Sequence, residues 1–162
     1  MTFYPEVRYD GERGEVSATF RPASTPPAIS RPDGTAFHYL ATRQSTEGDF
    51  GLYRVDMGPN SPGAANHFHR TISESFFVLS GSVRLFDGER WLDGTPGDFI
   101  YIPPGGLHAF KNESAAPASM LLLFAPGADR EGYFEGLRGL GAMNAEERDA
   151  FFRLHDNLFV SF

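Results

Sequence analysis

The central part of the chain alternates hydrophobic and polar residues in short runs, and each run ends at a turn signal. The runs are about four to eight residues long and are rich in β-branched and aromatic residues, a pattern that predicts β-strands. Asp87 and Gly88 between two of them predict a hairpin. The expected strands cover residues 37–43, 50–57, 74–79, 82–86, 89–92, 99–102, 107–112 and 118–124. So many short strands favour an all-β fold, either a double-sheet sandwich or a barrel.

The two ends of the chain do not follow this alternation. Residues 1–36 are polar and interrupted by several prolines, which predicts an irregular N-terminal arm. Residues 126–162 change to a helical spacing of apolar residues, so we expect two short helices packed on the strand region. Residues 37–125 then form the barrel, and a length of 162 residues suits a single domain overall.

Capping signals place the start of each expected helix. Asp129 precedes the first, and Asn144 followed by Glu147 forms a capping-box pattern before the second. Apolar residues then recur on one face of each helix: Tyr133, Phe134, Leu137 and Leu140 in the first, and Ala150, Phe151, Leu154 and Leu158 in the second.

Charge and composition exclude several classes of function. The chain has 14 basic and 21 acidic residues, a net charge of −7, and no basic cluster that would bind nucleic acid. It has no cysteine, so disulfides and thiolate zinc sites are excluded. No apolar run resembles a signal peptide or a membrane span, and we therefore expect a cytoplasmic protein without a membrane partner.

Two spaced motifs carry the candidate chemistry. The first is HxHxxxxExxxxxxG, with His67, His69 and Glu74 as possible ligands, and it ends at Gly81. The second is GxxxxxPxGxxHxxxN, and its histidine is His108. Its other fixed positions, Gly97, Pro103, Gly105 and Asn112, have residue types that suit turns and strand ends.

The spacing in the first motif requires a break in strand alternation between His69 and Glu74. Side chains two residues apart in a strand point to the same face, so His67 and His69 can reach one ion together. Glu74 is an odd number of residues from His69 and would point the other way in an unbroken strand. We therefore expect a bend or bulge at about residues 70–73.

Three imidazoles and one carboxylate predict a site for one divalent transition metal ion. Iron, nickel, cobalt, manganese, copper and zinc all suit such ligands, and the sequence does not choose among them. A single histidine in a strand is more often part of a hydrogen-bond network than a ligand. That structural interpretation is the one we apply to His38 and His155, which fit neither motif.

The two motifs resemble those of the cupin superfamily, over about residues 37–125. The second motif matches at every fixed position. The first lacks its leading glycine, which would fall at Ser61, whereas this chain has Gly63. The resemblance implies a double-sheet jelly-roll barrel of six to eight strands with the metal inside its mouth. The short segment between the motifs, residues 82–96, is similar to that of small bacterial single-domain cupins. This small form with an intact first motif resembles the quercetinase-like type.

The function remains open at this stage, because one fold can support many reactions. Strand alternation places Phe76 and Val78 on the face of Glu74, and Phe110 on that of His108, so these three residues line a substrate pocket or simply fill the core. The resemblance favours a metal-dependent dioxygenase acting with dioxygen on a flavonol-like or other planar, enolisable small molecule. Glu74 would then be both ligand and general base.

Two alternatives use the same four ligands. One is a non-redox polyketide cyclase, in which the metal acts only as a Lewis acid. The other is a metal-stabilised ligand-binding protein without turnover. In each case we expect a homodimer, because a phenylalanine-rich sheet edge and a proline-rich arm are commonly covered by a second copy of the chain.

Overall fold

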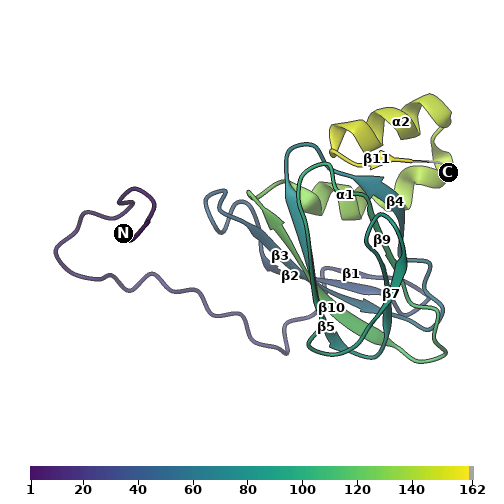
Figure 1. Cartoon of the computed structure of the whole chain (residues 1–162), viewed down its shortest axis with the longest axis horizontal. Coiled ribbons are helices and arrows are strands. Elements are labelled where there is room, and N and C mark those ends of the chain that lie inside the picture. The colour runs from purple at the N-terminus through teal and green to yellow at the C-terminus, as the bar shows by residue number, and fades with distance from the viewer. Residues whose placement is uncertain (161–162) are drawn as a thin grey trace.

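Two antiparallel sheets face each other in the computed structural model, which describes residues 1–160 (Figure 1). The six-stranded sheet has the order β1-β2-β3-β10-β5-β8, and the five-stranded sheet has the order β11-β4-β9-β6-β7. The strands are β1 (Ile29–Ser30), β2 (Ala36–Ala41), β3 (Gly51–Met57), β4 (Ala64–Phe68), β5 (Ser73–Ser80), β6 (Val83–Phe86), β7 (Trp91–Gly94), β8 (Phe99–Ile102), β9 (His108–Lys111), β10 (Ala118–Ala125) and β11 (Leu158–Phe159).

The chain passes repeatedly from one sheet to the other, so strands distant in sequence become neighbours. β3 pairs with β10, and β4 pairs with β9. Only β6 and β7 form a tight hairpin within the five-stranded sheet, around the Asp87 and Gly88 turn that the sequence predicted. Among the residues that the structure describes, no ladder joins the two sheets, so the expected barrel is an open two-sheet jelly roll.

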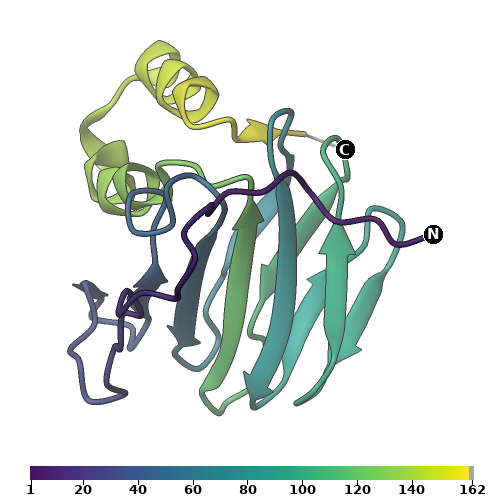
Figure 2. The same ribbon diagram turned by 90° about the vertical axis from the view of Figure 1, so that its left-hand side faces the viewer.

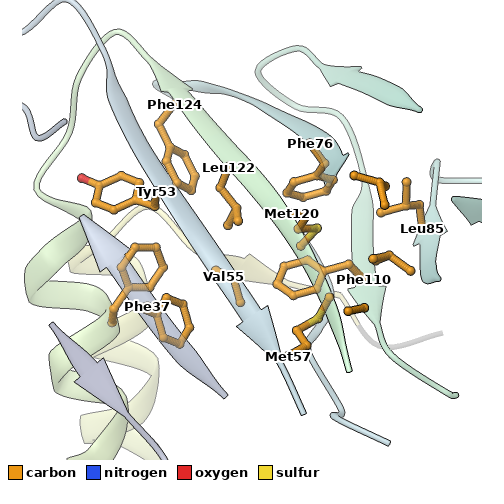
Figure 3. Close-up of a cluster of buried hydrophobic side chains, with 14 of the residues drawn as sticks. Phe37, Tyr53, Val55, Met57, Phe76, Leu85, Phe110, Met120, Leu122 and Phe124 are labelled. Carbon is orange, nitrogen blue, oxygen red and sulfur yellow. The ribbon is translucent and has the colours of Figure 1, made fainter. Parts of the chain in front are cut away.

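The hydrophobic core lies between the sheets, where the inward-facing side chains meet (Figure 3). Along β3 and β10 every second residue is buried, as period-two alternation requires. The register sets Leu122 opposite Tyr53 and Met120 opposite Val55, and all four are buried. This alternation is the property that made the strands predictable from the sequence.

The helices cover one end of the sandwich (Figures 1 and 2). They are α1 (Arg130–Gly136), the 3-10 helix η1 (Leu137–Ala142) and α2 (Ala145–Leu154). Asn144 and Glu147 form the predicted capping box of α2. Asp129 occupies the N-cap position of α1, but its side chain makes no capping hydrogen bond.

The end of α2 differs from the predicted helix face. Leu158 lies in β11 rather than on the helix, and Leu154 is 80% exposed. The helix ends at its C-cap residue His155, and Asp156 takes a positive φ of 54° that reverses the chain. The last described residues can therefore pair with β4.

The N-terminal arm extends away from the sandwich over residues 1–28 (Figure 1). Nearly all of its side chains are exposed, apart from a few that are partly buried near its end. The later part of the expected arm is structured, since β1 pairs with β2 and Ile29 is buried. No helix among residues 1–160 has the length and apolarity needed to cross a membrane.

Candidate metal centre

Both sheets contribute to a buried cluster of His67, His69, Glu74 and His108. His67 lies in β4 directly opposite His108 in β9, so the antiparallel register of the five-stranded sheet brings these two rings together. His69 follows the end of β4, and Glu74 lies in β5 of the six-stranded sheet. The potential ligand atoms of the four side chains all lie within 4.8 Å of one another.

A corner between the sheets brings Glu74 to the histidines. Residues 69–72 leave β4, bend, and enter β5 in the opposite sheet, which confirms the predicted break in alternation. Glu74 Oε2 lies 3.0 Å from His69 Nε2 and 2.7 Å from His108 Nε2. The break between His69 and Glu74 is therefore a change from one sheet to the other, and not a β-bulge within one strand.

Each imidazole is oriented by a main-chain carbonyl on its outer side. The Nδ1 atoms of His67, His69 and His108 lie 2.8, 2.6 and 2.9 Å from the carbonyl oxygens of Ala65, Asp156 and Gly106 respectively. A carbonyl only accepts, so each Nδ1 carries a proton and donates it. In the neutral rings every Nε2 then presents a lone pair, which is the orientation that metal-binding histidines use.

The donor set fits a divalent transition metal ion. Neutral Nε2 atoms cannot donate to a carboxylate, yet two of them lie within hydrogen-bond distance of Glu74 Oε2. Protons or a cation must therefore occupy the middle of the cluster. Metal bonds of about 2.1 Å place neighbouring ligand atoms about 3 Å apart, close to the separations seen here. The four residues could thus hold one divalent transition metal ion.

Burial and the neighbouring charges perturb the pKa values of this cluster. Burial lowers the pKa of His67 to about 3, and the nearby His108 acts in the same direction. For Glu74, burial raises the pKa, but hydrogen bonds from His108 and His69 outweigh it and hold the pKa far below its usual range. For His108, burial lowers the pKa, but the hydrogen bond and charge of Glu74 outweigh it and raise the pKa. Without metal, the cluster therefore favours a charged Glu74 beside a protonated imidazole.

A cavity of about 200 Å³ opens beside the cluster, with His67 and Glu74 in its wall. Aromatic side chains form much of the rest of the wall: Phe37, Phe110, Phe124, Tyr133, Phe134, Phe152 and Phe159. Of the three pocket residues predicted from alternation, Phe110 lines this cavity. Phe76 and Val78 lie in the hydrophobic core, and the Phe76 ring centroid is 5.9 Å from that of His108.

The C-terminal segment supports the site in a way that the sequence did not suggest. Asp156 accepts the His69 Nδ1 proton through its main-chain oxygen. Its carboxylate accepts hydrogen bonds from the amides of Arg70 and Thr71 and from the Thr71 hydroxyl. Asp156 thus holds both the corner and one ligand. In the sequence, the capping box of α2 and the helical spacing of apolar residues pointed to this region, but neither indicated a role at the candidate metal site.

The two remaining histidines lie outside the cluster. His38 Nε2 lies 2.9 Å from Asp56 Oδ2, and the His155 ring packs on Phe151 with ring centroids 4.7 Å apart. The shifted motif glycine also has a structural reason. Gly63 has a φ of 61°, and a Cβ there would lie 2.0 Å from the carbonyl oxygen of Phe110.

Comparisons with known proteins agree with this geometry. Residues 53–124 match the family model described as a cupin domain. The quercetin 2,3-dioxygenase of Bacillus subtilis (strain 168) is 25% identical over 75 residues, which cover 46% of this chain and 22% of that protein. The chain thus matches only about a fifth of this curated relative.

Two solved structures are similar in fold. A sugar phosphate isomerase from a cupin superfamily, from Silicibacter pomeroyi, has a TM-score of 0.51 and 27% identity over 57% of this chain and 60% of that one. The polyketide cyclase RemF from Streptomyces resistomycificus has a TM-score of 0.50 and 26% identity over 56% and 64% of the two chains. Residues 53–124 of this chain therefore match the cupin domain in sequence, and the fold is similar to that of a cupin-superfamily structure.

Proposed function

We propose that the protein is a metal-dependent cupin enzyme, and that it is a dioxygenase of a planar aromatic or enolisable small molecule. The observation that carries this proposal is the position of the cavity. His67 and Glu74 form part of its wall, so a small molecule bound in the cavity lies directly beside the four candidate metal-binding residues. The similarity to the quercetin 2,3-dioxygenase supports the choice of reaction.

The size and lining of the cavity favour a compact, flat substrate. Its aromatic wall provides surfaces for stacking against a planar ring. Its volume of about 200 Å³ is below the range of about 300–1,000 Å³ that is usual for ligand pockets. A compound of one or two rings therefore suits this cavity better than a complete flavonol, unless the helices that cover it move outward.

Glu74 would have two roles in this reaction. Its Oε2 atom faces His69 and His108, which leaves Oε1 as the oxygen available to a substrate O–H group. A bound divalent ion would supply Lewis acidity that lowers the pKa of a phenol or enol oxygen. The strongly lowered pKa of Glu74 makes it a weak base, so it can accept a proton only from a group whose acidity has been raised in this way.

Oxygen consumption tests the proposal directly. Protein loaded in turn with iron, manganese, nickel, cobalt or copper is mixed with quercetin, or with the smaller 3-hydroxychromone, in air and under nitrogen. We expect oxygen uptake and ring opening in air with at least one metal, and no activity in a His108→Ala variant. The absence of both signals with every metal and both compounds would overturn the dioxygenase proposal.

The second candidate is a non-redox cyclase, favoured by the similarity to the polyketide cyclase RemF. The same ligands and the same cavity would then act on an enolisable substrate without oxygen. Equal turnover of such a compound under nitrogen and in air would favour this candidate over the first.

A further inference from the structure

The cavity wall contains three charged side chains that belong to neither motif, and of these Arg130 is buried, whereas Arg31 and Asp33 are not. Arg130, the first residue of α1, lines the cavity together with His67 and Glu74. It is only 3% exposed, although arginine is rarely buried without a partner. Arg130 lies beside the candidate metal-binding residues because the C-terminal segment folds over the end of the sandwich (Figure 1).

The guanidinium is firmly held but incompletely satisfied. One terminal nitrogen donates to the His155 carbonyl at 2.7 Å, and the other donates to Asn157 Oδ1 at 2.8 Å. The guanidinium carbon, Cζ, lies 4.4 Å from the ring centroid of Tyr133 and 4.8 Å from that of Phe124. The group has five N–H donors, and its buried Nε has no hydrogen-bond partner among residues 1–160.

The charge of Arg130 is also uncompensated. Within the described part of the chain, no carboxylate lies within 4.0 Å of its nitrogens. Burial lowers the pKa of Arg130, and the negative charge of Glu74 only partly opposes this. A metal ion would engage the Glu74 carboxylate and add its own positive charge. The interior of the cavity would then have a net positive charge, which favours an anionic ligand.

We infer that Arg130 binds an oxyanion of the substrate, so that the substrate class is a planar aromatic or enolisable compound carrying a carboxylate. This inference rests on the proposed function and makes it more specific. The carboxylate pairs with the free N–H groups of Arg130, while the aromatic wall holds the ring. The fork geometry and fixed position of the guanidinium mean that little side-chain entropy is lost on binding.

A purely structural role for Arg130 would lead to a different result in ligand-binding experiments. If the side chain only ties α1 to residues 155–157, its removal will lower stability but will not change the preference between charged and neutral ligands. The test therefore compares two probes of nearly equal shape, 2-naphthoate and its neutral amide 2-naphthamide, by calorimetry on zinc-loaded protein. Zinc has no redox chemistry, so turnover does not interfere.

We expect the wild-type protein to bind 2-naphthoate at least tenfold more tightly than 2-naphthamide. Arg130→Met should bring the two affinities to within about threefold, and Arg130→Lys should retain part of the preference. The matched control is Arg153→Met, which removes an exposed arginine of α2 that pairs with Asp149 and should leave the preference unchanged. Zinc content and melting temperature are measured for each variant.

The inference is overturned if the wild-type protein shows no preference for the carboxylate, or if Arg130→Met keeps the full preference, since the metal alone would then account for it. If neither Arg130 variant folds, a crystal structure of the wild-type protein with 2-naphthoate decides. A carboxylate within 3.5 Å of the guanidinium supports the inference, and one bound only to the metal contradicts it. These readouts do not involve oxygen, so a failed dioxygenase assay leaves them interpretable.

Discussion

At the scale of single residues, the outward hydrogen bond of each histidine in the cluster distinguishes it from an ordinary group of buried imidazoles. All three Nδ1 protons are donated to main-chain carbonyls, so all three Nε2 atoms face inward together. The motif spacing predicted which residues meet. It could not predict the carbonyl of Asp156, because that acceptor is 87 residues away from His69 in sequence.

Removal of one ligand should abolish stoichiometric metal binding. His108 is completely buried and its Nε2 lies 2.7 Å from Glu74 Oε2, so His108→Ala removes a proposed ligand and also one partner of a buried carboxylate. We expect metal affinity to fall on the order of 100-fold or more. Elemental analysis and competition with a chelator measure this loss.

Ile102→Val provides the matched control for His108→Ala. Ile102 is buried opposite Glu74 in β8. We expect this variant to lose about 0.5–1.5 kcal/mol of stability while retaining its metal. Full metal occupancy in His108→Ala would show that this residue is not a ligand.

Metal affinity should increase with pH. The raised pKa of His108 means that its imidazolium persists to higher pH than that of a free histidine, and a metal must displace that proton. Affinity should therefore be weak below this pKa, rise by about tenfold per pH unit for each proton displaced, and level off above it. Calorimetry in buffers with different ionisation enthalpies counts the protons released. A constant affinity between about pH 5 and pH 8 would contradict the assignment of His108 as a ligand.

At the scale of elements, the corner between β4 and β5 is the feature on which the site depends. It carries the chain from one sheet to the other within the first motif, so residues from both sheets converge. The corner is held from outside the cupin domain by Asp156, directly after α2. The C-terminal segment is therefore a structural part of the candidate metal site as well as a cover for the cavity.

Asp156→Ala should weaken this corner. The variant loses the carboxylate that accepts hydrogen bonds from Arg70 and Thr71. We expect a loss of about 1–2 kcal/mol in the free energy of unfolding. Metal affinity should fall by roughly tenfold, because His69 is less well oriented. Urea unfolding of the metal-free protein and metal competition measure the two effects.

Asp156→Asn is the control for this change. It keeps a side-chain oxygen that can accept hydrogen bonds and is one of the residue types that tolerate the positive φ found here. It should therefore fall between the wild-type protein and Asp156→Ala in both measurements. Unchanged metal affinity in Asp156→Ala would show that the corner holds its shape without this contact.

At the scale of the whole molecule, the outer face of the six-stranded sheet has an apolar patch on β5 and β8. Phe77 and Leu79 of β5 and Phe99 and Tyr101 of β8 are all exposed, and β8 is an edge strand. The register sets Phe77 directly beside Phe99. A contiguous apolar patch next to an unpaired edge is typical of an interface, so we propose that a second copy of this chain covers it as a homodimer.

Polar substitutions in this patch should disrupt the dimer. Phe99 is 62% exposed and Tyr101 is 58% exposed, so replacing both with serine costs little stability in the monomer. We expect dimerisation to weaken by at least tenfold in sedimentation experiments, with the metal content unchanged. Leu154→Ser, at the end of α2 and 80% exposed, is the control and should leave the dimer intact. A monomeric wild-type protein at tens of micromolar would contradict the proposal.

The sequence by itself determined eight of the eleven strands found among residues 1–160, the mostly β class and the identity of the four candidate ligands, but not β1, β4 or β11. These properties depend on local periodicity and on fixed spacing, and both are visible in the sequence without knowledge of distant contacts. Even the break between His69 and Glu74 followed from counting residues in a strand.

Only the tertiary structure decided the form of that break, the open arrangement of the sheets, and the contents of the cavity wall. Arg130 and Asp156 reach the site because the chain after β10 folds back over the end of the sandwich and pairs β11 with β4. Phe76 and Phe110 share the same kind of alternation, yet only the latter lines the cavity. Such long-range contacts have no periodicity along the chain, and packing alone establishes them.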